Sequence, residues 1–150
     1  MPSPAEIAYR ESVRALEGEA QDLENIRSHV SLMLSAGGLA AAFLGALTHK
    51  HGVPFWIAVA AFVTISVATI IVYWPVSFPW DFDGYKLVST YVDVDPAKSE
   101  DFVMRELAVH AADDYRANRD TLNRLFTLQS IALAAFGLEI GALLLNLAIG

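Results

Sequence analysis

The chain has 150 residues, of which 55% are hydrophobic and 18% are charged, and its formal net charge is −7. This acidic balance argues against a nucleic-acid-binding surface, because such a surface must attract phosphates. The absence of cysteine excludes disulfides, thiolate chemistry and a cysteine-based metal site.

The apolar residues are concentrated in three blocks, Val30–Thr48, Val53–Trp74 and Leu125–Ile149. About 20 apolar residues in a helix span the roughly 30 Å hydrocarbon core of a bilayer. A soluble helix usually has an apolar stripe rather than apolar character all round. We therefore expect an all-α integral membrane protein with three transmembrane helices. A soluble helical bundle is the alternative.

The first segment, residues 1–29, is predicted to be a cytoplasmic amphipathic helix. Its apolar side chains recur at spacings of three and four, which is the pattern of one helix face. They are Val13, Leu16, Ala20, Leu23, Ile26 and Val30, and the opposite face is assigned Glu11, Glu17, Glu19, Asp22 and Glu24. No proline or turn cluster follows, so this helix, expected from Pro4, continues into transmembrane helix 1 at residues 30–48. The charged start of the chain is unlike a signal peptide.

A short outer loop at residues 49–52 is predicted to join the first span to transmembrane helix 2, at residues 53–74. A cytoplasmic linker at residues 75–96 follows, because its prolines end the helix. Trp74 and Trp80 are the predicted interfacial anchors, since tryptophan is enriched at membrane–water boundaries.

A second cytoplasmic amphipathic helix is predicted at residues 97–124, running into transmembrane helix 3 at residues 125–149. Asp95 is the predicted N-cap, and Pro96 suits the first helical position. One apolar stripe follows, made of Met104, Leu107, Ala111, Tyr115, Leu122 and Leu125. Each apolar stripe must be buried. We therefore expect the two cytoplasmic helices to pack on each other, or on the same helices of neighbouring subunits.

The distribution of Lys and Arg predicts the orientation. Nine of the 10 Lys and Arg residues lie before the first span or between the second and third spans, and only Lys50 lies in the first loop. By the positive-inside rule, the two basic segments are cytoplasmic. We expect a multi-pass protein of the bacterial inner (plasma) membrane, with its N-terminus in the cytoplasm and its C-terminus outside.

Glu139 is the one formally charged residue in the three apolar blocks. A carboxylate inside a span is costly and usually faces the bundle interior or a water-filled path. Thr64 in the second span is expected at a similar depth. One interpretation is that Glu139, together with Thr64, lines a pore or acts in proton sensing or gating. The alternative is a structural carboxyl, either protonated and hydrogen-bonded across a helix contact or hydrated near the outer surface.

Small residues recur every four positions in the first and third spans. The rows are Gly37, Ala41 and Gly45 in the first span, and Gly137 and Gly141 in the third. This spacing lets helix backbones approach closely. It predicts helix packing, either among the three spans of one chain or between the copies of a homo-oligomer.

No grouping of residues indicates catalysis. The chain has no glycine-rich phosphate loop and no HExxH motif. His49 and His51 lie in the outer loop without an evident third ligand. We therefore predict that the protein is not an enzyme and that it holds no metal and no cofactor.

A charged helix feeds the first span at Asn25–Gly45 (NIRSHVSLMLSAGGLAAAFLG), and another feeds the last at Asn118–Gln129 (NRDTLNRLFTLQ). With the short outer loop, this layout resembles the Pycsar-type transmembrane effectors of cyclic-nucleotide anti-phage signalling. It also resembles, more loosely, SLATT-like small bacterial multi-span membrane proteins. The resemblance implies a cytoplasmic region that binds a cyclic pyrimidine mononucleotide and spans that assemble to breach the inner membrane.

Three arginines are the candidates for binding an anion: Arg27, Arg119 and Arg124. They are chosen because they are the basic residues near the two helix–membrane junctions. Their alternative role is to anchor the cytoplasmic side by the positive-inside rule.

Three functions follow from these observations. The first is an oligomeric inner-membrane effector or pore-forming protein gated by its cytoplasmic helices, in anti-phage signalling. The second is a structural or accessory membrane subunit without activity of its own. The third is a small channel or transporter that uses Glu139.

Overall fold

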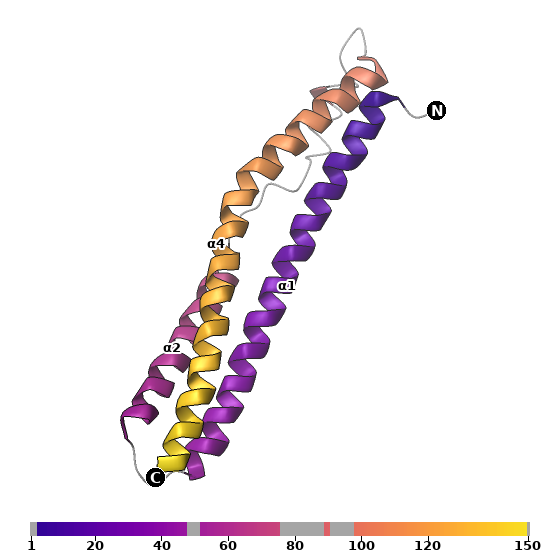
Figure 1. Cartoon of the computed structure of the whole chain (residues 1–150). Helices are drawn as coiled ribbons and strands as arrows, with labels where there is room; N and C mark the ends of the chain where they lie inside the picture. The colour runs from indigo at the N-terminus through magenta and orange to yellow at the C-terminus, as the bar shows by residue number, and fades with distance from the viewer. Residues whose placement is uncertain (1–2, 48–51, 76–88, 91–97, 150) are drawn as a thin grey trace. The chain divides into compact units, whose positions relative to one another are not determined.

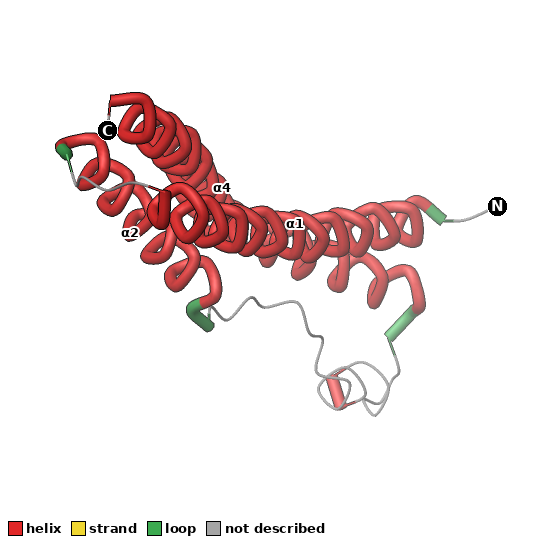
Figure 2. Tube along the Cα trace, turned by 90° about the horizontal axis from the view of Figure 1, so that it is seen from below, coloured by secondary structure: helices red, strands yellow, loops and turns green. Residues whose placement is uncertain are grey.

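The computed structural model describes residues 3–47, 52–75, 89–90 and 98–149. This part of the chain contains three long helices and no strand, as Figures 1 and 2 show. They are α1 (Pro4–Leu47), α2 (Val53–Tyr73) and α4 (Glu100–Ile149). Each is long and apolar enough to cross a membrane. The prediction of an all-helical chain with three helices of membrane-spanning length is therefore confirmed.

Helices α1 and α4 are much longer than a bilayer requires. They contain 44 and 50 residues, whereas about 20 suffice for a span. The 21-residue helix α2 matches the required length. If all three cross a membrane, about half of α1 and half of α4 must lie outside the hydrocarbon core.

Serine side chains cap the two long helices. The backbone N–H of Glu6 donates to Ser3 Oγ at 3.2 Å, and α1 begins at Pro4 as predicted. At the other helix, the N–H of Phe102 donates to Ser99 Oγ at 3.4 Å. The predicted helix start at residue 97 is wrong, because residues 98 and 99 are not helical, Ser99 supplies the cap and α4 begins at Glu100. The prediction of an N-cap at Asp95 is not tested. Asp95 and Pro96 themselves lie outside the described residues.

Helix α2 ends one residue earlier than predicted. Its last residue is Tyr73, and Trp74 has extended backbone angles (φ −58°, ψ 132°). Extended angles are expected before Pro75, because a proline disfavours helical geometry in the residue that precedes it. The Trp74 side chain is 66% exposed, as a boundary anchor needs. Trp80 lies outside the described residues.

The chain divides into two compact units. Unit 1 contains α1 as far as Asp22 and α4 as far as Leu122. The two helices run in the same direction there, because Ser12 contacts Ala108 and, further along both helices, Glu19 contacts Asn118.

Unit 2 contains the rest of α1 from Leu23, all of α2, and α4 from Asn123 (Figure 1). α1 and α4 are again parallel, and α2 runs against both of them. Its buried face alternates at spacings of three and four: Ala58, Ala61, Ile65, Ala68 and Val72. Within this face, Ala58 packs with Ala142 and Leu143 of α4, and Ile65 packs with Ala135. At the end of α2, the Tyr73 hydroxyl is 2.8 Å from Ser31 Oγ of α1.

A seven-residue repeat underlies the contact between α1 and α4. From Ala111 onward, every residue of α4 at one position of the repeat is buried: Ala111, Asn118, Leu125, Ala132, Glu139 and Asn146. The buried residues of α1 as far as Val30 alternate at spacings of three and four: Leu16, Glu19, Leu23, Ile26 and Val30. This spacing is typical of helices that pack side by side along a shared seam. Asn118 and Glu139 therefore lie in the seam, although both are polar.

The sequence pattern predicts Glu19 on the exposed face of α1, and this prediction is wrong. Its side chain is only 4% exposed. The reason is helical geometry, because Glu19 is three residues after Leu16 and four before Leu23, and such neighbours share a face. Apolar character alone does not identify Glu19 as a member of this face, because its side chain is polar.

Truncating Ile65 should destabilise unit 2. Its side chain is fully buried (0% exposed) between α2 and α4, so Ile65→Ala should leave a cavity and cost about 2–5 kcal/mol. Ile70→Ala is the matched control, since Ile70 is 60% exposed on the other face of α2. Thermal unfolding in detergent, followed by circular dichroism, measures both. Equal midpoints for the two variants would contradict the packing described here.

Candidate functional site

Glu139 is enclosed in unit 2 where α4 contacts α1. Its side chain is 0% exposed. Neither carboxyl oxygen has a hydrogen-bond partner among the described residues. On the same helix, Ala135 packs with Ile65 and Ala142 packs with Ala58, so Glu139 lies level with the middle of α2. This depth argues against a carboxyl hydrated near the outer surface.

Gly37 of α1 provides the space that the carboxyl group occupies. A Cβ atom built on Gly37 would lie 2.6 Å from Oε2 of Glu139 and 3.3 Å from its Cδ. Any side chain at Gly37 would therefore force the carboxyl group to move. Gly38, the next residue, is different, because a Cβ there would meet only the Phe62 ring at an ordinary 3.8 Å.

Thr64 is not brought to Glu139. Its side chain is exposed, and its hydroxyl donates to the Ala60 carbonyl of its own helix at 2.9 Å. The face of α2 that meets α4 includes Ala61 and Ile65, and Thr64 is one residue, or about 100°, from Ile65. The structure therefore does not support a pair formed by Thr64 and Glu139 within one chain.

The two rows of small residues lie in different surroundings. In α1, Gly37 is buried against Glu139, and Ala41 is half-buried. In α4, Gly137 and Gly141 are exposed, and a Cβ at either would meet no atom within 4 Å. A Cβ at Gly45 would likewise meet no atom within 4 Å. Gly137 and Gly141 each lie two residues from Glu139, so they face away from the seam that buries it.

Each of the three candidate arginines has its own surroundings. The guanidinium of Arg27 lies 5.7 Å from the centre of the Tyr73 ring. Arg119 lies over the ring of Tyr115 and donates to its hydroxyl. Arg124 is exposed. Stacking on aromatic rings leaves these arginines compatible with either anchoring or anion binding.

A buried polar pair lies in unit 1. Asn118 Nδ2 donates to Glu19 Oε2 at 3.2 Å, and the two side chains are 3% and 4% exposed. Neither residue was singled out as a site from the sequence. The signal that identifies Asn118 is its position seven residues after Ala111 and seven before Leu125. A polar residue at such a position in paired helices fixes their register.

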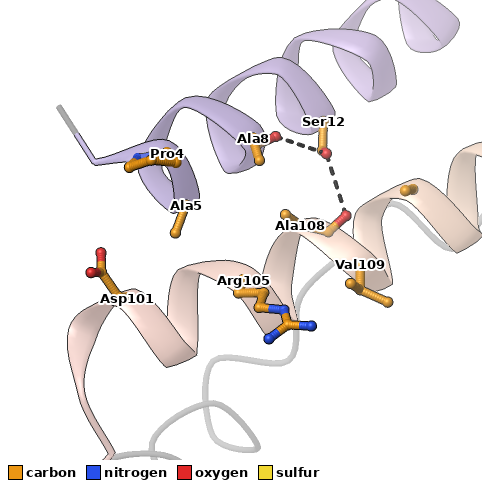
Figure 3. Close-up of a pocket in the computed structure, with 9 residues that line it drawn as sticks. Pro4, Ala5, Ala8, Ser12, Asp101, Arg105, Ala108 and Val109 are labelled. Atoms are coloured by element: carbon orange, nitrogen blue, oxygen red, sulfur yellow. Dashed lines mark hydrogen bonds between the residues drawn. The ribbon is translucent and has the colours of Figure 1, made fainter.

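Unit 1 also has a groove of about 660 Å³ between the first turns of α1 and α4. It exists because the facing side chains are small, as Figure 3 shows for Ala5, Ala8 and Ala108. Ser12, which also lines the groove, joins the two helices, since its Oγ is 2.9 Å from the Ala8 carbonyl and 3.3 Å from the Ala108 carbonyl. The full lining is Pro4, Ala5, Ala8, Ser12, Asp101, Arg105, Ala108, Val109 and Ala112. Arg105 is therefore a basic residue beside a groove, which the sequence did not indicate.

Comparisons with known proteins give no relative: no family model, no curated protein and no solved structure matches this chain. Within the described ranges, no three His, Asp or Glu side chains are grouped closely enough to hold a metal ion. The chemistry of the site must therefore be argued from its own residues, chiefly Glu139 and Gly37.

Replacing Gly37 by alanine should displace the Glu139 carboxyl group. We expect Gly37→Ala to destabilise the protein by about 1–3 kcal/mol, the usual cost of overpacking. The same change should cost much less in a Glu139→Ala background, where the clashing atoms are absent. Gly38→Ala is the control and should have little effect. Thermal unfolding of the four variants and the parent gives the coupling energy, and purely additive effects would refute the contact.

Removing the Asn118 amide should leave the buried Glu19 carboxyl group short of one donor. Asn118→Ala is expected to cost about 1–3 kcal/mol. Asn123, on the same helix, is exposed, so Asn123→Ala should be neutral or slightly stabilising, because alanine favours a helix. Thermal melting in detergent separates the two variants. If Asn118→Ala melts no earlier than Asn123→Ala, the pair does not stabilise unit 1.

Proposed function

We propose that this protein is an oligomeric effector of the bacterial inner membrane, whose cytoplasmic helices control the packing of its spans and so permeabilise the bilayer. In this proposal unit 2 lies in the membrane. Unit 1 lies in the cytoplasm with the N-terminus, in accord with the positive-inside distribution of Lys and Arg. The C-terminus is then outside.

The observation that supports this proposal best is that α1 and α4 each contribute to both units. Each helix has a charged segment in unit 1 and an apolar segment in unit 2. The charged segments pair through Glu19 and Asn118, and the apolar segments meet at Gly37 and Glu139. A ligand that altered the pairing in unit 1 would act on the same two helices that enclose Glu139.

The groove of unit 1 is the proposed binding site for the trigger. Its volume of about 660 Å³ falls within the roughly 300–1,000 Å³ typical of small-molecule sites. Arg105 is a charged donor for a phosphate, and the small apolar lining suits the face of a base. A cyclic pyrimidine mononucleotide, which the resemblance to Pycsar-type effectors implies, has both of these features.

A three-helix chain needs further copies to enclose a path through a bilayer. Gly137 and Gly141 support such an assembly, because they form an exposed small-residue row on α4. Rows of this kind let a second transmembrane helix approach closely. The occupant that we propose for this face is another copy of the same chain.

A second candidate function is a small channel or transporter in which Glu139 acts directly. The complete burial of Glu139 at the level of the middle of α2 favours it. The two functions differ in their trigger, because a channel of this kind would need no ligand in unit 1.

Dye release from proteoliposomes tests the proposal. We expect purified protein to release an encapsulated dye when cyclic cytidine or cyclic uridine monophosphate is added. Arg105→Ala should reduce the response at least about tenfold, as loss of a charged hydrogen bond of about 1.5–3 kcal/mol implies. Arg116→Ala is the matched control, since Arg116 is an exposed arginine of the same helix that pairs with Asp113.

Assembly is tested in the same vesicles. Replacing Gly137 and Gly141 by leucine should abolish both release and oligomers, while Leu138→Val should retain both, because Leu138 is already an exposed large side chain. Nucleotide-independent flux that is lost in Glu139→Gln would favour the channel. A protein that stays monomeric and releases nothing would leave only the accessory subunit.

A further inference from the structure

The Glu139 carboxyl group has no counter-charge in the apolar segments of the three described helices that pack around it. In α1 between Val30 and Leu47 no residue is titratable. In α2 the only titratable residue is Tyr73, and in α4 beyond Leu125 it is Glu139 itself. Tyr73 is at the end of α2, where its hydroxyl is close to Ser31 Oγ and the Arg27 carbonyl.

The nearest histidine along α1 is also engaged elsewhere. His29 Nδ1 is 2.8 Å from Gln129 Nε2, ten residues before Glu139 on α4. A helix rises about 1.5 Å per residue, so this pair is roughly 15 Å away. A negative charge on Glu139 would therefore be buried without compensation.

Burying a carboxylate in this environment costs many times more free energy than burying the neutral acid. The proton on Glu139 therefore determines whether α1 can close on α4 at this position. The neutral acid is tolerated because its burial costs only what an unpaired polar group costs, about 1–3 kcal/mol. That residual cost keeps the closed arrangement from being strongly favoured. The equilibrium between a closed arrangement, in which α1 packs on α4 at Glu139, and an open one can then be shifted by a proton. The proton binds well only to the closed arrangement.

We propose that Glu139 and Gly37 form a proton-binding site inside the membrane, at which α1 closes on α4 only while the carboxyl group carries a proton. Loss of the proton leaves a carboxylate that must be hydrated. Water then enters beside Gly37, and α1 separates from α4 at that level. Acid closes the contact and alkali opens it. The inference adds a regulator to the proposed effector and shares with it only the placement of unit 2 in the membrane.

A lipophilic carbodiimide tests the proton directly. The reagent reacts with a protonated carboxylic acid: the carboxyl oxygen bonds to the central carbon, the acid proton moves to a nitrogen, and the adduct rearranges to a stable acylurea. We expect dicyclohexylcarbodiimide to label Glu139 in proteoliposomes in mildly acidic buffer, as read by mass spectrometry. Above the titration midpoint labelling should fall about tenfold per pH unit, as expected for one titrating group. Glu139→Gln should abolish it, and Glu17→Gln, at an exposed position, should not.

Disulfide trapping tests the coupled movement. The chain has no cysteine of its own, so a pair can be introduced at Ala40 of α1 and Leu143 of α4, because Ala40 packs against the cluster formed by Ala58, Ala142 and Leu143. Oxidation by copper phenanthroline should cross-link the pair more in acid than in alkali. Thiols themselves oxidise faster in alkali, so thiol chemistry alone would give the opposite trend. In a Glu139→Gln background cross-linking should no longer decline in alkali.

Two results would overturn the proposal. One is Glu139 that is unlabelled at every pH, or labelled equally at all of them. The other is cross-linking whose pH dependence is the same with Glu139 and with glutamine. Neither measurement requires dye release or a nucleotide, so the proton site can fail while the proposed effector function stands, and the reverse also holds.

Discussion

Unit 2 depends on one steric constraint, the absence of a side chain at Gly37. A Cβ at this position would lie 2.6 Å from the Glu139 carboxyl group, so that group can keep its position between the two helices only if α1 carries a glycine there. The seven-residue repeat of α4 points Glu139 at α1, and the small residues Ala135 and Ala142 let α2 approach from the other direction. A carboxyl group thus occupies a position where a packed apolar side chain would be more stable.

The same repeat places other polar residues in the seam, and each has a distinct environment. The Asn118 amide donates a hydrogen bond to the carboxyl group of Glu19. Asn146 is 4% exposed and lies close to Gly52 at the start of α2. Glu139 differs from both, because its oxygens have no partner in the described part of the chain. Polar residues in a helix seam commonly fix register. Glu139, which has no such partner, is the residue suited to gain or lose a proton.

Much of the fold could be predicted from the sequence because apolar blocks of bilayer length are a strong signal. The three helices follow from hydrophobicity, and α1 begins at Pro4 as predicted. The start of α4 could not be placed as well, since Asp95 and Ser99 are both good caps and only the backbone decides between them. Glu139 was identified by its charge, but its partner Gly37 was identified only as one member of a packing row. Its particular role depends on which residue of α1 faces Glu139, and that is set by the register of two helices about 100 residues apart in sequence.

The errors have a common physical cause. Glu19 and Asn118 were left off the apolar stripes because they are polar, yet helical spacing places both on the buried face. Thr64 was paired with Glu139 on depth alone, although rotation about the α2 axis turns it outward. The depth of a residue in the membrane does not tell whether its side chain faces the neighbouring helices or the outside. For α4, a count of seven residues from Ala111 through Asn146 identifies the side chains that face α1, and this count can be made from the sequence.

The central claim is that Glu139 is a neutral acid enclosed by α1 and α4 in the membrane. The infrared spectrum of the protein in lipid bilayers tests it most directly, through the carbonyl stretch of a protonated carboxyl group. The account predicts a band at neutral pH, at the high frequency typical of a carbonyl without a hydrogen bond, that disappears in Glu139→Gln and is little altered in Glu17→Gln. A spectrum in which Glu139→Gln removes only carboxylate bands at neutral pH would contradict the account.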